Sequence, residues 1–201
     1  IGRICFIGVA IGLTMLAFTI SNYWGTPLVI LSLIVIGLPE GALLTLVFNV
    51  LVSASPKKLA GDVGALRGTA NNLATGLGTA LASVLAVSLL SSIIMNSLYK
   101  SPVITAEVIE EQLYLDNIDF VSNDDLDELL EEIDLTPVQE AEVIDINVEA
   151  RLLALKISFL VLASIALLAI IPAGGLPNYL PGEVPDEKTI QHDQIEAAPI
   201  N

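Results

Sequence analysis

The residue of this sequence with the clearest chemical potential is Glu40, a carboxylic acid inside an apolar stretch. It lies between Pro39 and Gly41 in the run VIGLPEGALLTLVFN. A charged side chain at the centre of a membrane helix costs about 2.5–3.5 kcal/mol, so such residues are rare and face protein groups or water. An acid that exchanges a proton within a cavity is a basic part of a proton-coupled carrier. We therefore expect Glu40 to serve proton coupling or to line a substrate cavity.

A structural role for Glu40 is the alternative. In that interpretation a protonated acid hydrogen-bonds to a neighbouring helix, or it faces water where the helix breaks. Pro39 favours such a break, because proline removes a helical hydrogen bond and clashes with the preceding turn. Both interpretations place the carboxyl group in the interior of a helix bundle or in a water-filled cavity.

Three asparagines are the other polar candidates in or near the apolar stretches: Asn49, Asn71 and Asn72. Asn49 lies nine positions after Glu40, half a turn round a helix, so the two cannot both face one cavity squarely. Lining a polar cavity is one role for these amides, and hydrogen bonding between helices is the other.

Other catalytic and metal-binding chemistry has little support. Cys5 and His192 are the only cysteine and histidine, so an internal disulfide and a zinc site of Cys and His are excluded by count. A Ser-His-Asp or Cys-His triad would need His192, which lies in a polar tail. The acidic run NDDLDELLEE lacks the glycine and the alternating ligands of a calcium-binding EF-hand loop. We expect no enzyme, no metal and no cofactor.

The composition is that of a membrane protein. Hydrophobic residues make up 54% of the chain and charged residues 15%, whereas soluble domains carry about 25% charged residues. The negative charge is concentrated, because 16 of the 23 acidic residues lie in 107–149. Nucleic acid is excluded as a partner, since phosphate binding needs a basic face.

Four stretches are apolar over the length that crosses a bilayer, about 20 residues. They comprise residues 4–20, 28–54, 70–98 and 152–171. The predicted fold is therefore an all-α polytopic membrane bundle of four transmembrane helices. The expected division is three spans in 1–100, an acidic extracytoplasmic segment in 101–150, the fourth span in 151–173 and a mobile cytoplasmic tail in 174–201.

Basic residues near the spans predict the orientation, because cytoplasmic loops are enriched in Lys and Arg. If all four stretches cross, Lys100 and Arg151 lie on one side, and the other side holds Arg3, Lys57, Lys58 and Arg67. We therefore expect a multi-pass protein of the plasma (inner) membrane with both termini of this chain in the cytoplasm. Residues 53–67 are expected to form a polar cytoplasmic loop.

The acidic segment has helical features. Leu126, Leu129, Leu130 and Ile133 follow the spacing of one helix face, and Ser122 is placed to cap that helix. Thr136, Pro137 and Gln139 form the pattern of a second capped helix, which would continue into the fourth span. We expect a small external helical hairpin, with a solvated acidic linker as the alternative.

Small residues recur at helical spacing in three spans and predict close helix packing. They are Gly8 and Gly12 in the first span, Gly37 and Gly41 in the second, and Ala74, Gly78, Ala82 and Ala86 in the third. This pattern is common to helical membrane bundles and does not indicate a particular function.

The stretch SASPKKLAGDVGALRGTANNLATGLGTALA, residues 53–82, carries a family resemblance. It joins a polar loop to a Gly-Ala-x-Arg segment, Asn-Asn and a small-residue helix. It resembles the C-terminal region of major facilitator superfamily carriers, in particular the fourteen-span drug:proton antiporter branch. The early Arg3, the external segment before the last span and the ending LPNYLPGEVP fit the same comparison, which covers essentially the whole chain through loose motifs.

The resemblance implies that the chain is the C-terminal fragment of a proton-coupled multidrug exporter. Such a carrier moves small, drug-like molecules by alternating access between two bundles. The implied partners are a small-molecule substrate, protons, the lipid bilayer and a missing N-terminal bundle of the same protein. The family's N-terminal motifs are absent, and Glu40 matches no coupling acid of the family. The alternative function is a free-standing four-helix membrane protein that binds a partner through its acidic hairpin.

Overall fold

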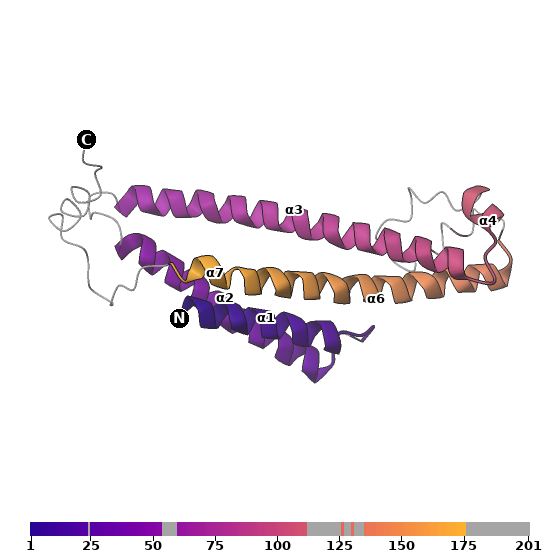
Figure 1. The fold of residues 1–201 in the computed structure, drawn as a ribbon, viewed down its shortest axis with the longest axis horizontal. Helices are drawn as coiled ribbons and strands as arrows, with labels where there is room; N and C mark the ends of the chain where they lie inside the picture. The colour runs from indigo at the N-terminus through magenta and orange to yellow at the C-terminus, as the bar shows by residue number, and fades with distance from the viewer. Residues whose placement is uncertain (24, 54–59, 112–125, 127–129, 131–134, 176–201) are drawn as a thin grey trace.

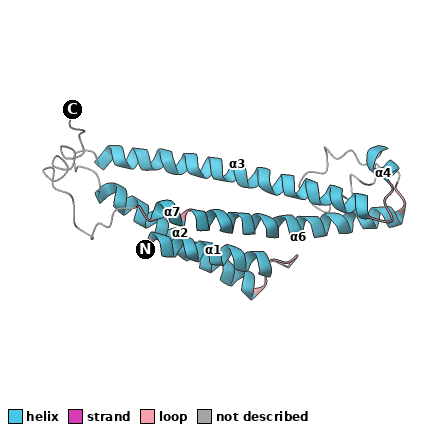
Figure 2. Ribbon diagram, viewed as in Figure 1, coloured by secondary structure: helices cyan, strands magenta, loops and turns pink. Residues whose placement is uncertain are grey.

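The computed structural model describes residues 1–23, 25–53, 60–111, 126, 130 and 135–175. Within these residues every regular element is a helix (Figure 2). Four helices are long and apolar enough to cross a membrane. They are α1 (Gly2–Thr19), α2 (Pro27–Ser53), α3 (Ala60–Lys100) and α6 (Pro137–Leu168), which α7 (Ile170–Ala173) extends. A short helix, α4 (Ala106–Glu111), follows α3.

Each long helix packs against one or more of the others. α1 packs against both α2 and α6, and α6 packs against α3 on its other side (Figure 1). The start of α1, the end of α2, the start of α3 and α7 lie at one end of the molecule. At that end the Arg3 guanidinium lies against Gly174, close to the C-terminus of the α6–α7 helix, where a positive charge is favoured.

α1 and α2 meet through a glycine pair. A Cβ atom added to Gly8 would lie 2.7 Å from Cγ of Pro39, and one added to Gly12 would lie 2.6 Å from Cγ1 of Ile36 and 2.9 Å from its backbone nitrogen. Only glycine permits this approach of the two helices. Further along the same contact, the hydroxyl oxygens of Thr19 and Ser32 lie 3.3 Å apart.

Pro39 does not break α2, so the predicted break is wrong. The helix runs from Pro27 to Ser53 with Pro39 inside it. Proline lacks the N–H that would bond to the carbonyl of Val35. Gly8 and Gly12 of α1 lie against Pro39 and the Val35–Ile36 backbone, so the weakened turn is supported by a neighbouring helix, an arrangement that also lets transmembrane helices tolerate proline.

The predicted loop over 53–67 is also wrong in its second half, because α3 begins at Ala60. Asp62 lies in the first turn of α3, where a negative charge complements the helix dipole. Arg67 lies over the ring of Phe48, with its Cζ 4.4 Å from the ring centroid. This cation–π contact joins the end of α2 to the start of α3. Lys57 and Lys58 lie outside the described residues.

α6 begins as the sequence predicts. The Thr136 side chain accepts a hydrogen bond from the backbone N–H of Gln139, whose side chain accepts one from the Thr136 N–H. Pro137 occupies the first helical turn. The helix then continues without interruption through the acidic residues into the fourth apolar stretch.

The core lies where α3 and α6 run together. α3 has 41 residues and α6 has 32, which correspond to about 60 and 48 Å, against about 30 Å for the hydrocarbon core of a bilayer. The buried cluster joins the C-terminal half of α3 to the first half of α6. Its members are Leu90, Ile94, Leu98, Ile104, Ile109, Leu126, Leu130, Val143, Ala150 and Ala154.

Part of the predicted hairpin enters this cluster. Leu126 and Leu130 are helical and buried, and the Ser101 hydroxyl donates a 2.8 Å hydrogen bond to Glu142. Ser122, Leu129 and Ile133 lie outside the described residues, as do residues 176–201 of the predicted tail. The hairpin as a unit therefore stays a prediction.

Candidate functional site

Glu40 lies on the outer surface of the described helices. The face of α2 that meets α1 includes Ser32, Ile36 and Pro39. Glu40 follows Pro39 and lies about 100° further round the helix, where its side chain is exposed. Within the described part of the chain it has no hydrogen-bond or ion-pair partner. The four helices do not provide the interior position that the sequence predicts for this acid.

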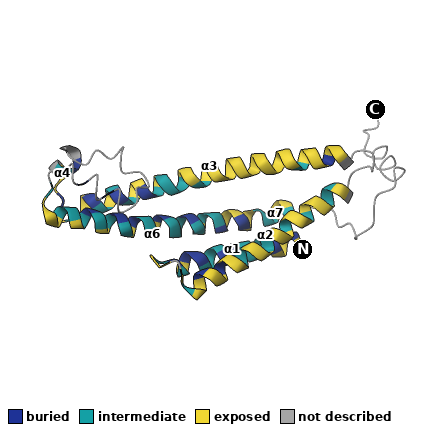
Figure 3. Ribbon diagram, turned by 180° about the vertical axis from the view of Figure 1, so that it is seen from behind, coloured by how far each residue is buried: buried dark blue, intermediate teal, exposed yellow. Residues whose placement is uncertain are grey.

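The three asparagines are exposed as well. Asn49 lies on α2, on the flank opposite Glu40, and Asn71 and Asn72 lie in the first half of α3. The first two turns of α3 contact the end of α2 through Arg67 and Phe48, and the rest of this half is exposed over most of its surface (Figure 3). The structure therefore does not gather Glu40 and the asparagines into one cavity of the described chain.

The small residues fall into two groups. Gly8 and Gly12 lie against α2, whereas a Cβ added to Gly37, Gly41 or Gly78 would meet nothing within 4 Å. Ala74 is exposed, and Ala82 and Ala86 are half-buried. One face of α2 and the first half of α3 thus present small residues that no described helix covers.

Sequence reasoning missed Lys156, a second charged residue inside an apolar stretch. It lies in α6, is half-buried, and is five positions from Arg151. A single charge in an apolar run, the signal that identifies Glu40, would have found it. Two positions further, Ser158 is buried, and its hydroxyl has no hydrogen-bond partner among the described residues.

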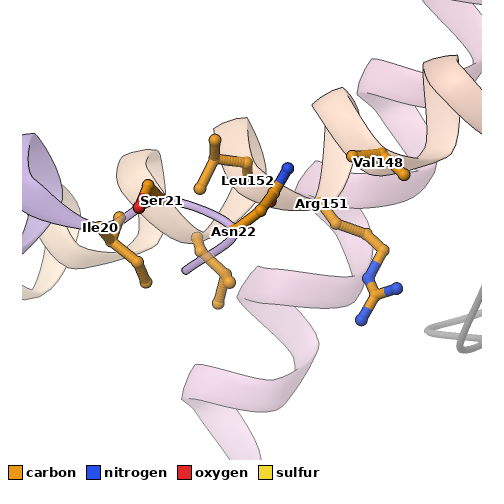
Figure 4. Close-up of a pocket in the computed structure, with 7 residues that line it drawn as sticks. Ile20, Ser21, Asn22, Val148, Arg151 and Leu152 are labelled. Atoms are coloured by element: carbon orange, nitrogen blue, oxygen red, sulfur yellow. The ribbon is translucent and has the colours of Figure 1, made fainter. Parts of the chain in front are cut away.

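A pocket of about 280 Å³ lies between the α1–α2 turn and α6 (Figure 4). The turn contributes Ile20, Ser21 and Asn22, and one face of α6 contributes Val148, Arg151, Leu152 and Leu155. The two segments are more than a hundred residues apart in the chain, so no local pattern predicts that they meet. The pocket is lined by three polar residues, Ser21, Asn22 and Arg151, and by aliphatic ones.

No metal centre is evident in the described ranges, where His, Cys, Asp and Glu form no group of three that could hold an ion. Comparisons with family models, curated proteins and solved structures found no match to this chain. The function must therefore be argued from the helices and their exposed polar groups.

Proposed function

We propose that this chain supplies four membrane-spanning helices of a proton-coupled secondary transporter of the major facilitator type, which exports small molecules. The observation that carries the proposal is the position of Glu40. It is exposed on α2, a 27-residue helix in which it is the only charged side chain. An ionisable group at such a depth is costly against lipid. The outer face of α2 therefore needs a polar cavity or a further helix beside it.

The neighbouring surfaces support this assembly. The first half of α3 exposes Asn71 and Asn72 together with Ala74 and Gly78. Amides and small residues are typical of contacts between membrane helices, where they hydrogen-bond and allow close approach. Further helices packed over this face and over Gly37 and Gly41 would enclose Glu40. A cavity between two such bundles is the arrangement of alternating-access carriers.

The proposed orientation follows from charge. Arg3 lies in the first turn of α1 and Arg67 near the start of α3, and the starts of these two helices lie at the same end of the molecule (Figure 1). Lys57 and Lys58 lie in the segment that joins α2 to α3. By the positive-inside rule this end is cytoplasmic. Both termini of the chain then lie in the cytoplasm, and the acidic segment lies outside the plasma membrane.

Proton coupling assigns a specific role to Glu40. The neutral acid is compatible with a closed, dry cavity, and the carboxylate with an open, hydrated one. Binding and release of one proton at Glu40 therefore couple the proton gradient to opening of the cavity on one side of the membrane or the other. A cationic substrate would compete with the proton for the Glu40 carboxylate. This competition would exchange one proton for one substrate molecule across the membrane.

The test is transport by the complete protein in proteoliposomes with an imposed pH gradient and a lipophilic cationic dye as probe. Glu40→Gln should abolish gradient-driven dye movement while the amount of folded protein in the membrane stays normal. The matched control is Glu149→Gln, which removes an exposed acid of α6 outside the apolar part and should leave transport unchanged. Gradient-driven transport at the wild-type rate in Glu40→Gln would end the proposal.

Partner binding through the acidic segment is a second candidate. The observation that favours it is the exposure of Asp145 and Glu149 on α6. The same part of this helix contributes Val143 and Ala150 to the buried cluster, so these acids lie on a packed element. A binding surface of this kind predicts that the charge reversals Asp145→Lys and Glu149→Lys remove a bound protein without changing transport.

A further inference from the structure

The exposed side chains of α3 change in character along the helix. Between residues 73 and 84 the large exposed side chains are apolar, namely Leu73, Leu77, Leu81 and Val84. Between residues 88 and 96 every exposed side chain is polar, namely Ser88, Ser91, Ser92 and Asn96. Leucine and valine suit lipid or further membrane helices, whereas serine and asparagine suit water. The surface of α3 therefore changes from a membrane type to an aqueous type near residues 84–88.

α6 shows the same change near residues 149–153. Before this point its exposed side chains include Asp145 and Glu149, and after it they include Leu153 and Leu160. Carboxylates are costly in hydrocarbon, so the part of α6 before the change suits water. α3 and α6 run side by side in opposite directions (Figure 1), and both changes border the buried cluster that joins the two helices. They therefore lie at about the same level of the pair.

The α1–α2 turn is a third marker of this level. It meets α6 at residues 148–155. It follows an α1 of 18 residues, which is about 27 Å long and close to the thickness of the hydrocarbon core. Tyr23 in the turn is 80% exposed, and tyrosine is enriched at the boundary between lipid and water. If the four helices cross a bilayer, one membrane surface lies at this level.

The buried cluster lies beyond that surface. All of its members except Ala154 fall within residues 90–150. Burial of apolar side chains is favourable in water, whereas lipid gives helices no comparable reason to associate. α6 begins at Pro137, so its first 14 residues extend about 20 Å past the change at residues 149–153. The best-packed part of the described chain is thus the part that projects from the membrane.

We propose that the end of α3 (residues 88–100), α4 and the start of α6 (residues 137–150) form a folded clamp in water, which holds the third and fourth spans together. The hydrogen bond from Ser101 to Glu142 fastens the clamp beyond the cluster. Residues 68–81 of α3 are all exposed, so α3 packs on α6 through the clamp and not through its membrane part. The third span then ends near Ala86, before the predicted end at residue 98.

The test is cysteine labelling of the complete protein in nanodiscs, which leave both membrane surfaces accessible to a membrane-impermeant maleimide. Asn96→Cys and Ser92→Cys should react, whereas Leu81→Cys should stay unlabelled. Cys5, which is buried in α1, is the background control, and peptide mass spectrometry locates each modified residue. Protection of both residue 92 and residue 96, or equal labelling at residues 81 and 96, would overturn the proposal. The same pattern is expected in Glu40→Gln, so the result does not depend on proton coupling.

A second measurement tests whether water drives the packing of the clamp. Leu98 is 0% exposed, so Leu98→Cys should be protected in buffer. Urea weakens the burial of apolar groups in water, and it should make this thiol reactive while Cys5 stays protected by the bilayer. A thiol at residue 98 that needs as much urea as Cys5 would overturn the proposal. Ser92→Cys and Asn96→Cys change exposed positions and keep the test open if Leu98→Cys does not fold.

Discussion

The two halves of α3 have different surroundings although they belong to one uninterrupted helix. In the C-terminal half Leu90, Ile94 and Leu98 are buried in the cluster with α6. In the N-terminal half Leu73 and Leu77 are 61% and 57% exposed. The exposed half also holds Asn71, Asn72 and the small residues, so it is the less suited of the two to face lipid alone. The packed half of α3 therefore supports the described fold, whereas the open half carries amides and small residues that no described helix covers.

Leucine truncation gives the largest expected contrast. Leu98→Ala removes a side chain that is 0% exposed and should destabilise the protein by about 2–5 kcal/mol. Leu77→Ala in the exposed half should change stability by less than about 0.5 kcal/mol. Thermal unfolding in detergent, followed by circular dichroism, measures both. Equal losses would show that the two halves are not differently packed.

Alanine substitution of two glycines compares the face of α2 that α1 covers with the face that no described helix covers. The two substitutions should differ in their effect on stability. Gly12→Ala places a Cβ against the side chain and backbone of Ile36 and should cost about 1–3 kcal/mol through overpacking. Gly37→Ala meets nothing within 4 Å and should be neutral or stabilising by up to about 1 kcal/mol, because alanine is the better helix former. The melting temperature should therefore fall for Gly12→Ala and stay unchanged or rise for Gly37→Ala. A loss at Gly37 in the complete protein would identify a further helix over this face.

The start of α6 allows a smaller test of the packed end. Thr136→Ala removes the side-chain acceptor for the Gln139 N–H and should cost about 1 kcal/mol. Thr136→Ser keeps the hydroxyl and should retain most of the stability. A Thr136→Ala variant that melts like wild type would show that the cap does not stabilise this end.

The contact between Phe48 and Arg67 should have the smallest effect, because it is a single cation–π pair at an accessible site. Phe48→Leu keeps an apolar side chain but removes the ring and should cost about 0.5–1 kcal/mol. The same change at Phe18, which is 77% exposed, is the control. Equal melting temperatures for wild type and Phe48→Leu would show that the pair does not hold α2 to α3.

Local chemistry accounts for what the sequence predicts well. The first two apolar stretches, predicted at 4–20 and 28–54, agree closely with Gly2–Thr19 and Pro27–Ser53, because bilayer length and hydropathy determine them. The capping pattern at Thr136 also depends only on neighbouring residues. Local signals were misleading at Pro39 and over 60–67, where contacts from α1 and from Phe48 support helical backbone.

Contacts between distant segments account for what the sequence does not predict. The pocket joins residues 20–22 to residues 148–155, and no periodicity relates the two segments. The spacing of the glycines predicts that helices can approach closely, but it does not predict which helix they meet. The outward position of Glu40 likewise depends on which face of α2 is covered by α1.

The most direct test of proton binding at Glu40 is the reaction of this residue with a hydrophobic carbodiimide in membranes that contain the complete protein. Such a reagent attacks a protonated carboxyl group in an apolar environment, and peptide mass spectrometry locates the product. A proton-carrying cavity acid predicts modification of Glu40 that falls as pH rises and is reduced by a bound cationic dye. An unmodified Glu40, or modification that neither pH nor dye affects, would contradict a proton-carrying role for this residue.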